Sequence, residues 1–537
     1  MKLKINLKLP ILDYDPKGSH DAQLFCHNRL SPHRTDLNAE VSCPSGDRRT
    51  RRKGRSAMAK DLRTYLEQIQ REKPHSFLRI KKPIKVAYEI TALQRKLDAV
   101  QKYPVIFVER PILDDGRESP FPVVTNLTAS RDLCAEILGI NPRRVAMEYA
   151  AKVANRIEPV VVSRDEAPVK EVVEKGEKVN LSKFPIFTHN YMDPGPYIGS
   201  GFVTCADPDT GIDNTSLQRM WVKSPRRTGY WASVTSHSMQ NINKWWSRGQ
   251  DMPVAVWIGH HPAAIAGGQS KLAYPESHYP SMGGVMGEPL RLVPSETFGD
   301  ALMVPADAEI VIEGYVPKDV FEAEGPFGEY PGYIGPQRPS NVIEVACVTY
   351  RQDAIFHGIG VGLADHLVFL GNFPMEARIY SVVKNVLPEL MNVHVPISGR
   401  RNHVYLQVKK SRPGIGKDAI MATLPCDSRL KHVFVVDEDV DLFNEGDVMW
   451  SVAYRSQWDK DLVVVKGSAV FPLDPSLPAP GNIGTRGGID ATAPPPIGIG
   501  LPRFYQMINK TPDEVAEAIN LEDYIDPEAL AKYPTSF

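Results

Sequence analysis

The chain has 537 residues, more than one hydrophobic core usually organises, so about two or three domains are expected. Its 63 basic and 64 acidic residues leave a formal net charge of -1, which argues against a general affinity for nucleic acid or anionic membranes and favours small-molecule partners. No apolar run reaches the roughly 18 residues that a transmembrane helix needs, and six scattered cysteines indicate a reduced, cytoplasmic protein.

Residues 1–57 differ in texture from the rest of the chain. They are rich in proline, serine and arginine, they lack hydrophobic periodicity, and they end in a basic run at 48–55. We interpret them as a disordered leader, or as residues that precede the true initiator Met58. A targeting peptide is the alternative, although the acidic residues of the segment do not suit one. The basic run is more typical of a solvated tail than of a nucleic-acid contact.

Helical and strand patterns alternate over residues 58–160, which predicts an N-terminal α/β domain. Four apolar residues near its start have the spacing of one face of an amphipathic helix: Leu62, Tyr65, Leu66 and Ile69. A second helix is expected between Ser130, a good N-cap, and Gly139, a good helix stop. Further elements are expected at 77–80, 92–100 and 104–108.

The pattern changes twice in the remainder of the chain. Residues 161–355 carry short β-like runs separated by turns, which predicts a barrel. Residues 356–537 return to alternation and predict a C-terminal α/β domain, with a helix at 375–386 and a buried strand at 433–436. The fold class is therefore α/β, with an α+β character from the central barrel, and the last domain is expected to mediate oligomerisation.

A loop inside the predicted barrel carries two acids, Glu324 and Glu329, separated by Gly-Pro-Phe-Gly. Glycine and proline exclude a helix here, so both carboxylates belong to a turn. Two acids on a tight loop suit proton transfer, because burial and mutual repulsion can raise the pKa of one while the other stays ionised beside a cation. A surface turn with two ordinary acids is the alternative.

A second stretch of the barrel region has Asn214, then Arg219 five residues later, and His237 after a linker. Together with the Glu324–Glu329 loop, this pattern resembles the UbiD family of reversible decarboxylases, which use prenylated FMN and include the ferulic acid decarboxylases. The resemblance extends from about residue 58 to beyond 490.

The resemblance implies roles for individual residues. Arg219 would hold the substrate carboxylate, Glu329 would protonate the carbon that loses carbon dioxide, and Glu324 would orient Arg219; from the sequence alone the two glutamates are interchangeable. A strand arginine in a structural salt bridge is the alternative for Arg219. The barrel would be a split β-barrel that holds the flavin, and the cofactor-binding positions would be Asn214, Ser216, Leu217, Arg219, Ser236, His237 and Lys417.

The resemblance also implies a divalent metal that neutralises the flavin phosphate. Asn214 and His237 match the family's metal positions, and the third ligand is either Glu276 or His278, with slightly more weight on Glu276. Manganese or magnesium would favour the glutamate, whereas histidine would admit a softer ion. Potassium is a further ion that we consider.

The expected substrate is an aromatic or heteroaromatic carboxylic acid that releases carbon dioxide. Tyr330, Phe471 and Leu473 resemble the walls of the family's ring pocket, and Asp474 and a tyrosine hydroxyl suit a phenol, which favours a hydroxylated benzoate. A flavin prenyltransferase would supply the cofactor to a homodimer or larger homo-oligomer. The alternatives are a non-catalytic assembly subunit of a carboxylase complex and a flavin oxidoreductase; the first predicts damage to Arg219 or the two glutamates, and the second needs a nicotinamide site.

Overall fold

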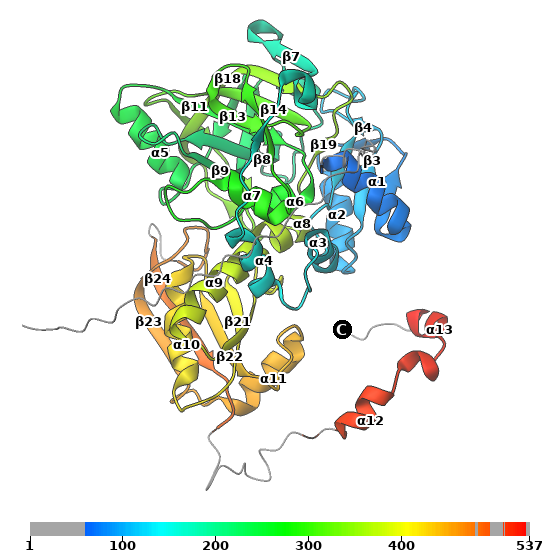
Figure 1. The fold of residues 1–537 in the computed structure, drawn as a ribbon, viewed down its shortest axis with the longest axis vertical. Coiled ribbons are helices and arrows are strands. Elements are labelled where there is room, and N and C mark those ends of the chain that lie inside the picture. Colours follow the sequence, from blue (N-terminus) through cyan, green and yellow to red (C-terminus); the bar gives the residue numbers. More distant parts are fainter. Residues whose placement is uncertain (1–59, 478–481, 495–508, 510, 533–537) are drawn as a thin grey trace, which may run out of the picture. The chain divides into compact units, whose positions relative to one another are not determined.

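The computed structural model describes residues 60–477, 482–494, 509 and 511–532 (Figure 1). The predicted leader, residues 1–57, lies outside these ranges. Within them the fold is a mixed α/β architecture built on a four-stranded sheet, a barrel and a five-stranded sheet, so the predicted fold class is confirmed. None of the helices in the described ranges is long and apolar enough to cross a membrane.

The N-terminal part has a four-stranded sheet in the order β1-β3-β5-β19. The predicted first helix, α1, begins after Asp61, whose carboxylate accepts a hydrogen bond from the Thr64 amide (2.9 Å). All four residues of its predicted apolar face are buried. The last strand of the sheet comes from residues after the barrel, so the chain returns to its first domain. The elements are α1 (Leu62–Glu72), β1 (Phe77–Ile80), α2 (Glu89–Ala99), β3 (Val105–Val108), β5 (Val123–Thr125), α3 (Arg131–Leu138), α4 (Val145–Ala154) and β19 (Phe356–His357).

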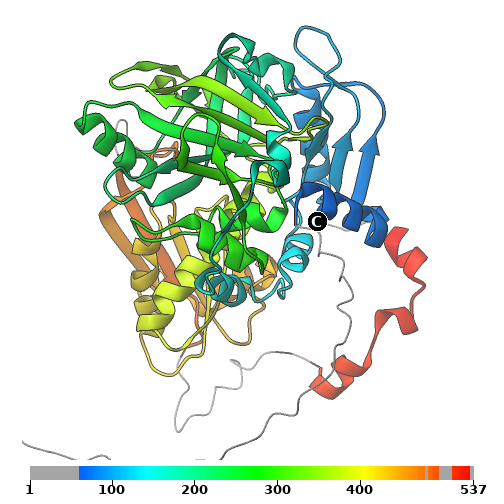
Figure 2. The ribbon, with the colours of Figure 1, turned by 45° about the horizontal axis from the view of Figure 1, so that its top comes forward.

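The central part is a closed barrel of six strands in the order β10-β9-β8-β11-β14-β18, and β18 pairs back with β10 (Figure 2). Val254, Val256 and Ile258 of β11 join one buried cluster while Ala255 and Trp257 join another, so both faces of the strand are covered. This explains the continuous apolar run. The elements are β7 (Val172–Lys175), β8 (Tyr197–Ala206), β9 (Asp213–Ser224), β10 (Arg227–Tyr230), α5 (His237–Ser247), β11 (Met252–Ile258), α6 (Pro262–Gly267), α7 (His278–Met286), β14 (Ile310–Val316), β15 (Phe321–Glu324) and β18 (Arg338–Tyr350).

The C-terminal part has a five-stranded sheet in the order β20-β21-β22-β24-β23. Val433 and Val435 of β22 pack into one buried cluster with residues of α9 and α10, whereas Phe434 and Val436 pack on the other face with Val448 of α11. The elements are α8 (Ala364–Leu367), the π-helical turn η6 (Val368–Asn372), α9 (Phe373–Val386), β20 (Leu390–His394), β21 (His403–Val408), α10 (Ile415–Thr423), β22 (His432–Asp437), α11 (Glu445–Arg455), β23 (Leu462–Ala469) and β24 (Ile483–Asp490). The domain limits 58–160, 161–355 and 356–537 stay predictions.

A buried carboxylate, Glu376 of α9, connects the N-terminal and C-terminal parts. Its two oxygens accept hydrogen bonds from Nη1 and Nη2 of Arg131 in α3, at 3.0 and 2.9 Å. The same carboxylate accepts the Val395 amide (2.9 Å) and lies 3.0 Å from Nδ1 of His394. Burial opposes ionisation of Glu376, but these partners prevail and lower its pKa. The charge is therefore fully compensated by groups from both domains.

We expect Glu376→Ala to lower the free energy of unfolding by about 3–5 kcal/mol, because it leaves the partly buried Arg131 guanidinium without its partner. Urea denaturation followed by circular dichroism measures this change. Glu438→Ala, the same substitution at an exposed position of the same domain, is the matched control and should leave the transition unchanged. Equal urea unfolding midpoints for the two variants would show that Glu376 does not stabilise the fold through Arg131.

Candidate active site

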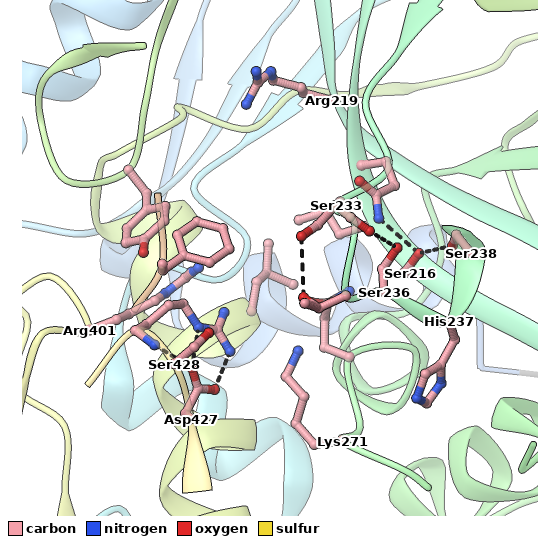
Figure 3. A pocket seen from close by; sticks show the side chains of 18 of the residues that line it. Ser216, Arg219, Ser233, Ser236, His237, Ser238, Lys271, Arg401, Asp427 and Ser428 are labelled. Carbon is pink, nitrogen blue, oxygen red and sulfur yellow. Dashed lines mark hydrogen bonds and ion pairs between the residues drawn. The ribbon is translucent and has the colours of Figure 1, made fainter. Parts of the chain in front are cut away.

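A cavity of about 480 Å³ lies between the barrel and the C-terminal domain (Figure 3). The barrel contributes residues 214–219 of β9 and residues 235–238 at the start of α5, and the C-terminal domain contributes Arg401, residues 427–429 and Phe471. Its size lies within the range of cofactor and ligand pockets. Both sequence motifs that define the expected site therefore open into one cavity.

Arg219 binds both predicted acids. Its Nε and Nη2 donate to the two oxygens of Glu324 at 3.0 and 2.9 Å, and its Nη1 donates to Oε1 of Glu329 in a short contact. The guanidinium also lies 4.6 Å from the ring centre of Trp231 and 5.0 Å from that of Phe327. The surface-turn interpretation of the two acids is excluded, because all three charged side chains are at most 9% exposed.

The loop between the two acids has a fixed shape. Strand β15 ends at Glu324, and Gly325 follows with a φ of +82°, a conformation that favours glycine. The Glu329 amide donates to the Tyr333 carbonyl (2.9 Å), and the Gly332 amide donates to the Glu329 carbonyl (3.0 Å). Gly325–Pro326 is a cis peptide bond. The backbone thus turns so that two side chains five residues apart reach the same guanidinium.

The two glutamates face different surroundings. Glu329 lines the cavity, whereas Glu324 lies behind Arg219, where its Oε1 also accepts a hydrogen bond from the Tyr197 hydroxyl (3.3 Å). Burial raises the pKa of Glu329, the Arg219 charge opposes this, and the Glu324 charge adds to the rise. One acid therefore faces the cavity with a raised pKa, while its partner holds the arginine.

The expected cofactor positions are brought together with one exception. Asn214, Ser216, Leu217 and Arg219 of β9 line the cavity with Ser236 and His237 at the start of α5. The Ser236 hydroxyl caps α5 by accepting a hydrogen bond from the backbone amide of Met239 (3.2 Å), and Nδ2 of the Asn214 side chain donates to the Ser238 hydroxyl (3.1 Å). Lys417 lies on α10 and does not line the cavity.

Four cationic side chains that the sequence analysis did not identify also line the cavity: Lys271, Arg378, Arg401 and Arg429. Figure 3 shows Lys271 pointing between the serines of the barrel and Asp427 of the C-terminal domain. Surrounding protein, and then Arg429, Arg401 and Arg378, lower the pKa of Lys271. The sequence around Lys271 or Arg378 carries no functional motif. Each lies in a segment that reaches the cavity only when the chain is folded.

The residues considered as metal ligands do not all converge. Asn214, His237 and His278 line the cavity, but Glu276 does not, and it instead forms a short ion pair with Arg156. Nδ1 of His278 accepts the Thr215 amide (3.3 Å). The described residues contain no group of three or more histidine, cysteine or acidic side chains placed to hold a metal ion. His278 lines the cavity and Glu276 does not, and the choice of the third ligand stays a prediction. One amide and two imidazoles do not fit the all-oxygen preference of magnesium.

The expected ring-pocket residues Tyr330, Phe471 and Leu473 form a small apolar cluster with Leu367. The ring centres of Tyr330 and Phe471 are 6.1 Å apart, and burial raises the pKa of the Tyr330 hydroxyl to about 12. Asp474 is not in this wall of the cavity, because its carboxylate pairs with Lys431 (2.8 Å). A phenol contact by Asp474 is thus not supported.

The fold and the site have counterparts among known proteins. Residues 70–153, 160–364 and 368–491 match the N-terminal, Rift-related and C-terminal domains of the 3-octaprenyl-4-hydroxybenzoate carboxy-lyase family, UbiD. The chain is 33% identical over 388 residues to anhydromevalonate phosphate decarboxylase of Methanothermobacter thermautotrophicus, covering 71% of this chain and 88% of that protein. It is 30% identical over 457 residues to phenolic acid decarboxylase of Sedimentibacter hydroxybenzoicus, covering 81% and 92%.

Solved structures give the same result. The UbiD-class enzyme HmfF of Pelotomaculum thermopropionicum in complex with FMN superposes with a TM-score of 0.78 at 33% identity, over 87% of this chain and all of that one. The closed form of vanillic acid decarboxylase of Sedimentibacter hydroxybenzoicus gives 0.74 at 28% identity, over 88% and 99%. Fold and site together define a carboxy-lyase. The chain belongs to the UbiD family of prenylated-FMN-dependent decarboxylases, as the sequence motifs indicated.

The raised pKa of Glu329 predicts a pH-dependent contribution to stability. The folded protein keeps this proton to a higher pH than the unfolded chain, whose carboxyl titrates near 4.5. The free energy of unfolding therefore falls as pH rises from about 4.5 through the folded-state pKa, by about 1.4 kcal/mol per pH unit, and is level above it. Glu329→Gln should abolish this decrease in the free energy of unfolding, because glutamine has no carboxyl group to titrate.

We therefore expect the stability difference between Glu329→Gln and the cofactor-free wild-type protein to move in favour of the variant as pH rises through that range. Urea denaturation at intervals between pH 4 and 8 measures it. Glu438→Gln, at an exposed position, should give a curve parallel to the wild type. A parallel curve for Glu329→Gln as well would show that the Glu329 carboxyl keeps its ordinary pKa.

Proposed function

We propose that this protein reversibly decarboxylates an aromatic or heteroaromatic acid, with prenylated FMN as its cofactor. The single observation that carries the proposal is the Arg219 guanidinium, held from behind by Glu324 and in contact with Glu329 on the cavity side. Tyr330 and Phe471 offer apolar walls to a flat ring, which supports an aromatic acid. Relatives that act on phenolic acid, vanillic acid or anhydromevalonate phosphate show the range of substrates within the family.

The donor set of the cavity fits a flavin phosphate. Lys271 and Arg378 line it without an ion-pair partner among the described residues, and His237 lies close enough for both cations to lower its pKa, after burial. A phosphate dianion would neutralise this cluster. The hydroxyls of Ser216 and Ser236 add hydrogen-bonding groups. These residues would hold the cofactor, which two UbiD-class structures similar to this chain contain as FMN and as prenylated FMN.

Asn214, His237 and His278 are the residues that would hold a divalent ion, and their imidazoles suit a softer metal than magnesium. The cofactor would come from a flavin prenyltransferase. We still expect this protein to form a homo-oligomer and to be located in the cytoplasm.

When bound, prenylated FMN supplies the electron sink that no side chain can provide. The task of the protein residues is to orient the acid and to move one proton. Arg219 offers the substrate carboxylate its Nη1 side, which also contacts Glu329, because Glu324 already occupies the Nε and Nη2 donors. As carbon dioxide leaves, its bonding electrons stay on the carbon, and the Glu329 carboxyl transfers its proton to that atom. Uptake of a proton from water restores Glu329, and the reverse sequence carboxylates the product.

The proposal is tested by the cofactor requirement. Protein made together with a flavin prenyltransferase should release carbon dioxide from members of a panel of aromatic acids, whereas the same chain loaded with unmodified FMN should not. Carbon dioxide release is measured by mass spectrometry, and the absorption spectrum identifies the bound flavin. Equal turnover with both flavins would contradict the proposal and favour an ordinary flavin enzyme.

The roles of the two glutamates can be distinguished by measuring how fast the product exchanges its hydrogen with deuterated water. Glu329→Gln keeps the shape of the side chain but removes the transferable proton, so exchange should slow by at least about 100-fold while flavin still binds. Glu324→Gln should also impair turnover, because Arg219 loses its orienting partner. If Glu329→Gln exchanged at the wild-type rate while Glu324→Gln did not, the two roles would be reversed.

A further inference from the structure

Another arginine of the cavity, Arg401, has no carboxylate bound to it among the described residues. Arg401 is only 5% exposed and lines the cavity from the loop between β20 and β21. Its Nη2 donates to the His366 carbonyl (2.6 Å), but its buried Nε has no hydrogen-bond partner. No carboxylate of the described residues forms an ion pair with it. A buried charge without a partner is costly, and proteins rarely keep one unless a ligand completes it.

The neighbouring acid does not supply the missing partner. Asp427 is bound by Arg429, whose Nε and Nη2 lie 2.8 and 2.5 Å from its oxygens. Burial, and then the Arg429 charge, lower the pKa of Arg401 to about 9, so its guanidinium still carries its charge at neutral pH. Asp427 thus balances one of two arginines on this side of the cavity, and Figure 3 shows Arg401 and Asp427 together there.

The backbone is shaped to admit the Arg401 guanidinium. The guanidinium packs against Gly371 in the π-helical turn η6. A Cβ atom added to Gly371 would lie 2.0 Å from Nε of Arg401. Arg401 itself has a φ of +71° and the preceding Arg400 a φ of +44°, both in the left-handed region that non-glycine residues rarely adopt. Such strain, and irregular helical turns, concentrate at functional sites.

The position of Arg401 assigns it to the ring pocket. Its guanidinium lies 5.0 Å from the ring centre of Tyr330, which packs with Phe471, and it is bonded to His366. Arg219 and Glu329 belong to a separate cluster, in which two carboxylates face one cation. Glu324 and Glu329 thus lie beside Arg219, whereas Arg401, which has no acid bound to it, lies beside the ring of Tyr330.

We propose that Arg401 binds a second anionic group on the substrate, a carboxylate or a phosphorus oxyanion carried by the part of the molecule that is not decarboxylated. The proposal rests on the proposed decarboxylase function and narrows its substrate class to acids with two anionic groups. A guanidinium that lacks a carboxylate partner suits either oxyanion, because both form charge-assisted hydrogen bonds with it.

The test compares benzoate and cinnamate with their derivatives that carry a carboxylate or a phosphonate at ring position 3 or 4. The holoenzyme with prenylated FMN should prefer at least one two-anion acid over its parent, measured as the ratio of kcat/KM values. Arg401→Gln should reduce this ratio by about 10- to 100-fold, the usual effect of losing a hydrogen bond to a charged group. Preference for carboxylate or for phosphonate identifies which oxyanion the site accepts.

Arg412→Gln is the matched control, since it removes one positive charge from an exposed arginine of the same domain that pairs with Asp418. It should leave the ratio unchanged. Binding of the same acids to protein loaded with unmodified FMN, followed by flavin absorbance, provides a readout that does not require turnover. There too, Arg401→Gln should weaken the two-anion acids selectively.

The outcomes separate this inference from the proposed function. If the holoenzyme decarboxylated the single-anion parents with a kcat/KM equal to or greater than that of every two-anion acid, the second-anion site would be refuted while the decarboxylase function stood. The same would follow if Arg401→Gln left the ratio of the two kcat/KM values unchanged. If no acid turned over but Arg401-dependent binding of two-anion acids persisted, the proposed function would fail and the anion site would stand. Loss of flavin from purified Arg401→Gln would assign the arginine to the cofactor and overturn the inference.

Discussion

The site depends on keeping the guanidinium of Arg219 charged in a place from which water is largely excluded. A charge removed from water is stable only if its partners are close and correctly oriented, and Glu324 meets this condition with two hydrogen bonds near 3 Å. The barrel makes the pairing possible: Glu324 ends β15, which pairs with β18, which pairs with β10, which pairs with β9 where Arg219 lies. Closing the barrel therefore also brings Arg219 and Glu324 together.

Charge is distributed unevenly around the cavity. Two carboxylates share Arg219 on one side, whereas Lys271, Arg378 and Arg401 have no carboxylate bound to them among the described residues. In the proposed reaction, an anionic cofactor and an anionic substrate would find cations away from the reacting carbon and a proton donor beside it. This asymmetry would orient a bound acid, because the reverse orientation would place anionic groups against Glu329.

Local patterns determined much of the fold. The first helix follows from the spacing of its apolar residues and the capping group of Asp61, and α3 runs from Ser130 to Gly139 as its end signals required. The strand at 433–436 was recognisable because both of its faces are buried. Arg219, Glu324 and Glu329 could be chosen because the short motifs that carry them resemble those of the UbiD family. Such features depend on neighbours in the sequence, so a sequence reports them directly.

Other features were decided by tertiary contacts alone. Glu276 and His278 are two residues apart, and the sequence slightly favoured Glu276. In the structure α7 begins at His278, which lines the cavity, whereas Glu276 pairs with Arg156, which follows α4. Lys417 was expected near the flavin, yet the cavity contains Lys271 instead. A lysine or arginine carries no local sign of its surroundings; whether it faces solvent, a carboxylate or an unbalanced cavity depends on which distant segments fold against it.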